Sequence, residues 1–158
     1  MTEINRGLLA RGTMNRAGRI KLAAVFAALV TTLAACSGGD ADAYPIRPTQ
    51  EFVTRGKPIY DLRCSSCHGD ARTRPPLASA PTHQADGHTW HHPDRLLVEW
   101  VLDGVPLAKT MPKWRGQLSE EDTRAVIAYI KTFWPTNVLE QQIRSSVEYE
   151  AQLKEDAR

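Results

Sequence analysis

The sequence predicts an all-α fold, and three observations lead to this expectation. Apolar residues recur at intervals of three and four over residues 51–64, 94–103 and 120–134, which is the spacing of one face of a helix. Residues typical of helix ends border these stretches, since Gly104 follows the second and Ser119 precedes the third. No stretch alternates between apolar and polar residues as a half-buried strand would.

Each predicted helix has its own start and stop signals. The first begins near Glu51, and it ends at Cys64. The second opens at Pro93-Asp94 and stops at Gly104, which is a typical residue beyond a helix C-terminus. The third follows Ser119-Glu120-Glu121-Asp122, which resembles a capping box, and Pro135 lies just beyond its end.

Two further regions complete the predicted domain. Residues 70–92 contain several prolines and few aliphatic side chains, so we expect a long irregular loop, which usually has a functional reason. Residues 136–158 have apolar side chains at helical spacing among mixed charges. They predict an amphipathic C-terminal helical extension that packs on the domain or, as the less favoured alternative, binds a partner. Its apolar positions are Val138, Leu139, Ile143 and Val147.

The segment Cys64-Ser65-Ser66-Cys67-His68 is a C-x-x-C-H motif, the attachment signature of a c-type haem. Two thiols three positions apart on a helical turn can each add to a vinyl group of one porphyrin, and His68 then lies under the iron as a ligand. A zinc site would need a second pair of ligands, and a thioredoxin-like dithiol would need a βαβ pattern. The motif therefore predicts one covalently bound haem c.

Met111 is the expected second axial ligand of the iron. The other two methionines, Met1 and Met14, lie in or before the apparent signal peptide, so Met111 is the only methionine of the mature chain. It stands in a loop-like stretch before Pro112, a setting that favours ligation over core packing. A thioether opposite an imidazole raises the reduction potential and leaves no open position on the iron.

Residues 1–35 are predicted to be a lipoprotein signal peptide. Basic residues precede an uncharged apolar run over 22–33, and Leu33-Ala34-Ala35-Cys36 resembles the lipobox in which the cysteine is acylated. A plain secretory signal is the alternative. Residues 36–50, rich in Gly, Asp and Pro, read as a flexible tether to a domain over 51–135. Met14 is an alternative start to Met1.

Charge and cysteine usage fit this interpretation. The formal net charge of the whole chain is +2, but removal of residues 1–35 leaves 15 basic and 17 acidic residues, a net charge of −2. Nothing in this balance indicates a nucleic-acid partner. Haem would take two of the three cysteines and lipid the third, Cys36, so no disulfide is expected.

From Phe52 to Pro135 the chain resembles a class I monohaem cytochrome c. The resemblance rests on Gly56-Lys57-x-x-Tyr60-x-x-x-Cys64-x-x-Cys67-His68-Gly69, on Thr110-Met111-Pro112 and on Ala128-Tyr129-Ile130. It implies a small all-α cytochrome c fold around one covalent haem, here with an extra C-terminal helix.

The resemblance also implies two contacts. The first and last helices of the domain would cross, with Gly56 allowing close approach near Tyr129. A proline carbonyl would accept the hydrogen bond from the outer nitrogen of His68, a contact that fixes a ligand's tautomer. Pro76, directly before Leu77, best fits the family's Pro-x-Leu position, and Pro75 is the alternative.

Residues 82–92 depart from the minimal family because they are rich in histidine. Clusters of this spacing can hold copper or zinc, but the carboxylate or thiolate company of a settled metal site is not evident. We therefore favour a polar loop or contacts to the haem propionates over a second metal site. The residues concerned are His83, His88, His91 and His92.

The sequence thus predicts a one-electron carrier without enzymatic activity of its own. It would face the periplasm, anchored by lipid on Cys36, with the outer membrane favoured because Ser37 follows the cysteine. Its partners would be redox proteins in or near the membrane, with neither nucleic acid nor a small-molecule substrate. Alternatives are an electron-entry subunit of a respiratory or dehydrogenase complex, and a haem sensor or copper-handling protein.

Basic residues bracket Met111 and predict a docking surface. In a chain of net negative charge, a local basic group at the haem edge would steer encounter with an acidic partner. A merely solvated loop is the alternative. The residues are Lys109, Lys113 and Arg115.

Overall fold

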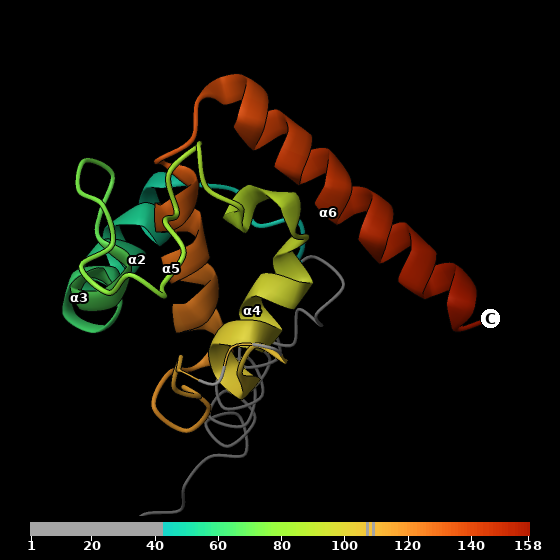
Figure 1. Ribbon diagram of the computed structural model, residues 1–158. Helices are drawn as coiled ribbons and strands as arrows, with labels where there is room; N and C mark the ends of the chain where they lie inside the picture. Colours follow the sequence, from blue (N-terminus) through green and yellow to red (C-terminus); the bar gives the residue numbers. More distant parts are fainter. Residues whose placement is uncertain (1–42, 107, 109) are drawn as a thin grey trace, which may run out of the picture. The chain divides into compact units, whose positions relative to one another are not determined.

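A computed structural model describes residues 43–106, 108 and 110–158, and over these residues the protein is helical (Figure 1). This confirms the predicted all-α class. No β-strand occurs in the described part, which has only two isolated bridges. The helices are α2 (Gln50–Arg63), α3 (Ser65–His68), α4 (Asp94–Asp103), α5 (Glu120–Lys131) and α6 (Thr136–Asp156), with a 3₁₀-helix η2 (Thr89–His91).

The helix ends follow the predicted local chemistry. The Ser119 hydroxyl accepts a hydrogen bond of 3.0 Å from the amide of Asp122 at the start of α5. The Thr49 hydroxyl does the same for the amide of Phe52 in α2, at 3.3 Å. Gly104 ends α4 with a φ of 95°, a conformation that side chains disfavour. Local capping thus sets where the helices begin and stop.

Helices α2 and α5 cross at close range, as the resemblance implied (Figure 1). The contact point differs from the expected one, because a Cβ on Gly56 would lie 1.9 Å from the carbonyl oxygen of Ala125. Tyr129 lies one turn further along α5, where its ring meets that of Tyr60 edge-on with centroids 5.4 Å apart. Backbone therefore meets backbone at Gly56 and Ala125, and only a glycine fits this position of α2.

The described part of the predicted tether packs on the domain. Ile46 is 1% exposed and belongs to the hydrophobic core, and the guanidinium of Arg95 lies 4.7 Å from the centre of the Tyr44 ring. The expectation of a flexible segment up to residue 50 was therefore wrong for residues 44–46. The polar and proline-rich composition of this segment gave no sign that Ile46 is a core side chain. Residues 36–42 lie outside the described part.

A buried ion pair connects four segments of the domain. Asp94 and Lys131 are both fully buried, with the Lys131 Nζ 2.8 Å from the carboxylate. The same ammonium donates to the carbonyl of Ile46 at 2.7 Å, and the Ile46 amide donates to Asp94 at 2.7 Å. From α6, Gln142 donates to Asp94 at 2.8 Å, and the Ser146 hydroxyl accepts from the Asp94 amide at 3.0 Å.

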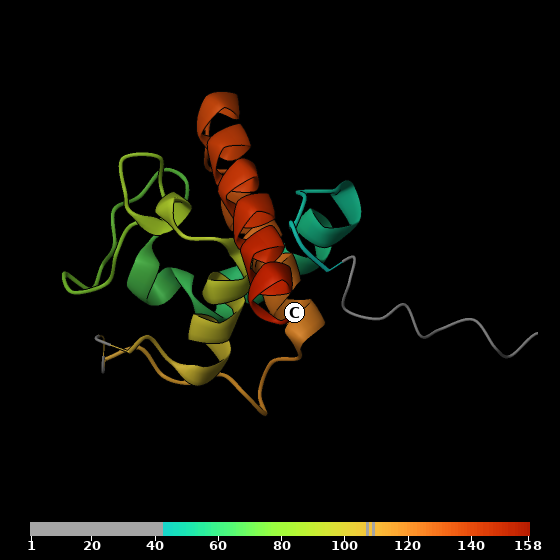
Figure 2. The same cartoon turned by 90° about the vertical axis from the view of Figure 1, so that its right-hand side faces the viewer.

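The C-terminal extension is a helix that packs on the domain over part of its length. Helix α6 contacts α4 and η2 (Figures 1 and 2), and Glu150 forms two hydrogen bonds with Arg95, of 2.8 and 2.7 Å. Its fully buried side chains are the polar Gln142 and Ser146, whereas Val147 of the predicted apolar face is 48% exposed. Residues 151–158 are all exposed.

Within the described ranges, every helix is too short or too polar to cross a membrane. The predicted signal peptide, the predicted acylation site Cys36 and the basic residue Lys109 lie outside those ranges.

We predict that Lys131→Met lowers the free energy of unfolding by about 3–5 kcal/mol, because it leaves the Asp94 carboxylate buried without its counter-charge. Urea denaturation of the haem-loaded full chain measures this. Lys57→Met is the matched control, since the Lys57 pair with Asp61 is exposed and such pairs contribute little. Equal midpoints for the two variants would contradict the role given to the buried pair.

Candidate haem site

The C-x-x-C-H motif lies on a helical turn, as expected. Cys64 ends α2 and precedes α3, and its carbonyl accepts hydrogen bonds from the amides of Cys67 at 3.1 Å and His68 at 3.0 Å. The Ser65 hydroxyl donates to the carbonyl of Asp61 at 2.7 Å, which connects the turn to α2. Cys64 and Cys67 form no disulfide with each other. The thiols and the imidazole are thus presented from one rigid turn.

Gly69 lets the chain turn sharply after His68. Its φ is 71°, and a Cβ there would lie 2.5 Å from the carbonyl oxygen of Thr73. The buried Tyr60 hydroxyl donates to the Gly69 carbonyl at 2.9 Å. The turn that carries His68 is therefore fastened to the α2–α5 core.

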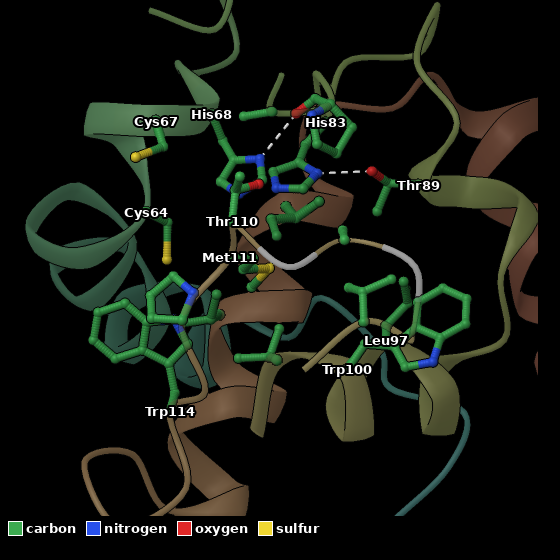
Figure 3. Close-up of a pocket in the computed structure, with 18 of the residues that line it drawn as sticks. Cys64, Cys67, His68, His83, Thr89, Leu97, Trp100, Thr110, Met111 and Trp114 are labelled. Atoms are coloured by element: carbon green, nitrogen blue, oxygen red, sulfur yellow. Dashed lines mark hydrogen bonds between the residues drawn. The ribbon is translucent and has the colours of Figure 1, made fainter. Parts of the chain in front are cut away.

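One pocket brings together the four residues predicted to hold the haem. Cys64, Cys67, His68 and Met111 all line it. Figure 3 shows the two thiols on one side of the pocket and Trp100 with Leu97 on the other. The walls are largely apolar, and α4 and α5 supply Leu97, Trp100, Val101, Val126, Ile127 and Ile130.

The orientation of His68 depends on Pro81. The Nδ1 of His68 lies 2.9 Å from the Pro81 carbonyl oxygen, so Nδ1 carries the proton and Nε2 keeps its lone pair for a ligand. The expectation of Pro76 or Pro75 was wrong. Leu77, next to them, instead brings its amide to 3.4 Å from the Cys67 carbonyl and lines the pocket.

His83 lies against His68, a placement that the sequence did not indicate. The two imidazole rings stack with centroids 4.3 Å apart and planes 19° from parallel, and the His83 Nδ1 is 2.7 Å from the Thr89 hydroxyl (Figure 3). Burial, and to a lesser degree His68, lowers the pKa of His83 to about 3. His83 is therefore neutral at ordinary pH. The contact expected from a Pro-x-Leu segment comes instead from Pro81-Thr82-His83, in which the Pro81 carbonyl contacts the His68 ring and His83 stacks on it.

The other loop histidines form a separate group. The rings of His88 and His91 stack with centroids 4.6 Å apart, and His92 meets Trp100 edge-on at 4.6 Å. Burial lowers the pKa of His92, and His88 and His91 lower it further. In the part of the chain that the structure describes, no three His, Cys, Asp or Glu side chains are grouped so as to hold a metal ion. A copper site in this loop therefore has no support from the described residues.

The donor set fits haem c. Two thiols, an imidazole with its Nε2 available and a thioether share an apolar pocket. Burial raises the pKa of the Cys64 thiol to about 11, with a smaller contribution from Cys67. Before haem attachment, burial thus disfavours the thiolate form of Cys64.

The comparison with known families agrees with the geometry. Residues 51–130 match the family described as cytochrome c oxidase, cbb3-type, subunit III. The chain belongs to this family. It is accordingly a c-type cytochrome that binds haem c covalently and transfers electrons. No curated protein and no solved structure matches the chain.

The rim of the cytochrome's pocket has a different charge pattern from the expected one. Arg115 forms two hydrogen bonds of 2.6 Å with Asp103, so much of its charge is locally compensated. Arg63 lines the pocket, with its guanidinium 5.7 Å from the centre of the Trp114 ring. Lys113 is exposed and has no ion pair among the described residues. Arg63 thus adds to the pocket lining a positive charge that lies far from Met111 in the sequence.

Proposed function

We propose that this cytochrome is a one-electron carrier with a single haem c, joined to Cys64 and Cys67 and ligated by His68 and Met111. The observation that supports this most strongly is the gathering of two thiols, an imidazole and the only mature methionine in one apolar pocket. The chain has one C-x-x-C-H motif, which supports a single haem.

Each residue has a distinct role in this proposal. Cys64 and Cys67 would each hold the haem through a thioether, formed by addition of the S–H bond across one vinyl C=C bond with no atom lost. The Pro81 carbonyl accepts the Nδ1 proton of His68 and directs Nε2 toward the iron position. Haem c, when bound, supplies a couple between ferric and ferrous iron, whose ferrous form the Met111 thioether favours. Because His68 and Met111 would both be used as iron ligands, the iron would offer no open position to a substrate, and the chain would catalyse no bond change.

The proposed location is the periplasmic face of a membrane, held by lipid on Cys36. Support comes from the sequence, in which an apolar run and Leu33-Ala34-Ala35-Cys36 precede the domain. Ser37 after the cysteine favours the outer membrane. The partners would be redox proteins in or near that membrane.

A second candidate function is an electron-entry subunit of a larger respiratory complex. The description of the matched family names an oxidase subunit, and α6 lies wholly beyond the matched residues and adds surface to the domain. Purification under mild detergent separates the two candidates, since a carrier would elute alone and a subunit would elute in a stoichiometric complex.

We predict that Met111→Ala opens the sixth coordination position. The variant should bind carbon monoxide in the ferrous state and show a lower reduction potential, because it loses the thioether that favours ferrous iron. Visible spectroscopy and redox titration measure both effects. Leu77→Ala, which trims a pocket side chain that cannot ligate iron, should show neither. Unchanged coordination spectra in Met111→Ala would give the ligand role to a histidine.

We predict that Cys36→Ala blocks acylation, so that the protein stays uncleaved or is released from the membrane. Metabolic labelling with a fatty acid and cell fractionation test this. Ser37→Asp is the matched control, expected to keep the lipid but move the protein to the inner membrane. Acylated wild-type protein found only in the inner membrane would contradict the outer-membrane assignment.

We predict that reversing Lys109 and Lys113 to Glu slows electron transfer with the native partner mainly through association. Added salt should shrink the difference, because the Debye length is about 8 Å at physiological ionic strength. Stopped-flow kinetics at several salt concentrations measure this. Reversal of Lys154 and Arg158, on the exposed end of the chain, gives the same net charge and should have little effect. Rates indifferent to both charge and salt would place the contact elsewhere.

A further inference from the structure

His83 occupies an unusual place for a polar side chain. It lines the haem pocket beside His68, two residues after Pro81, whose carbonyl contacts the His68 ring. We propose that His83 is a positioning residue that fixes the ring plane of the axial ligand His68. This inference rests on the proposed ligation of iron by His68.

The His83 ring is itself held from several sides. Its Nδ1 is 2.7 Å from the hydroxyl of Thr89, a buried residue of η2. Its backbone carbonyl accepts a hydrogen bond of 2.7 Å from the indole nitrogen of Trp134, which is also buried. The ring of Tyr60 meets it edge-on with centroids 6.1 Å apart. Contacts to both ring and backbone leave His83 little freedom to turn.

The neighbouring loop is fastened in the same way. The side-chain amide of Gln84 donates hydrogen bonds of 3.0 Å to the carbonyls of Asp70 and Thr73. These bonds connect the segment after His83 to the segment after His68. The two imidazoles are therefore set on backbone stretches that are joined to each other, and their separation is fixed by more than the stack alone.

His83 restricts a tilt of the His68 ring that the hydrogen bond to Pro81 only weakly opposes. The hydrogen bond at Nδ1 holds one side of the His68 ring, and iron at Nε2 would hold a second point. The angular tolerance of the hydrogen bond still leaves a tilt of the ring plane, by small rotations about the Cβ–Cγ bond that joins the ring to the chain. A flat ring 19° from parallel and 4.3 Å away opposes this tilt over the whole face. A leucine would offer only methyl groups and no fixed plane.

The plane of an axial imidazole affects the electronic structure of low-spin iron. Its π orbitals interact with one of two iron d orbitals more than with the other, so the plane sets the splitting between them. Ligand orientation is one of the ways in which a protein tunes its haem. With the same plane in both oxidation states, His68 need not rotate when an electron arrives or leaves.

The test compares ferric, haem-loaded variants by electron paramagnetic resonance and by the proton shifts of the haem methyl groups. His83→Leu should shift and broaden the largest g value and change the spread of methyl shifts. His83→Phe, which keeps a flat ring, should restore most of the wild-type pattern. Thr89→Val, which removes the hydrogen-bond partner of Nδ1, should broaden the signal. His91→Leu makes the same chemical change on the same loop, outside the pocket, and should change nothing.

The outcomes separate this inference from the proposed function. A wild-type protein without low-spin His/Met spectra would overturn the ligation, and the inference with it. Wild-type His/Met spectra that stay unchanged in His83→Leu would overturn only the role of His83. Circular dichroism and the thermal midpoint show whether each variant is folded. If His83→Leu fails to fold, Thr89→Val keeps the test decisive, because an unchanged signal in that variant would overturn the role of His83.

Discussion

The buried ion pair of Asp94 and Lys131 is the interaction on which the pocket depends most. Asp94 begins α4 and Lys131 ends α5, so each charge also lies at the helix end whose partial charge it opposes. Burial lowers the pKa of Lys131, and attraction to Asp94 works against this shift. Such a pair adds little net stability over an apolar contact. If its two helices moved relative to each other, however, a buried charge would lose its partner, at a high cost in free energy. The two helices that form the pocket walls are thereby fixed to each other.

Features encoded locally could be predicted from the sequence, and features that join distant segments could not. The helices, the cap at Ser119 and the turn of the C-x-x-C-H motif all follow from neighbouring residues. The polar centre joins Ile46 to Lys131, which is 85 positions away. Periodicity carries no information about such a pairing. The segment before α2 therefore looked like a tether, although Ile46 is one of the most buried side chains.

The loop between α3 and α4 shows the same limit in the site itself. Three prolines precede His83, and the pattern could not tell which carbonyl lies beside the His68 ring; the structure places Pro81 there. The spacing of His83, His88, His91 and His92 suggested one cluster. Their ring contacts divide them, with His83 stacked on His68 and the others grouped near Trp90 and Trp100. His88 and His92 still line the same pocket as His83, whereas His91 does not. Residue type along a loop is thus a poor guide to the contacts that each side chain makes.

The packing of α6 bears on the choice between a carrier and a subunit. The middle of α6 is part of the domain, since Gln142 and Ser146 contact Asp94. The surface that α6 leaves for a partner is its outer face and its C-terminal end, where residues 151–158 are exposed, and Val147 and Leu153 are its exposed large apolar side chains. Permanent interfaces are large and more apolar than this, whereas transient redox contacts are small. The surface that α6 offers therefore fits brief encounters better than a permanent place in a complex, and it favours the carrier.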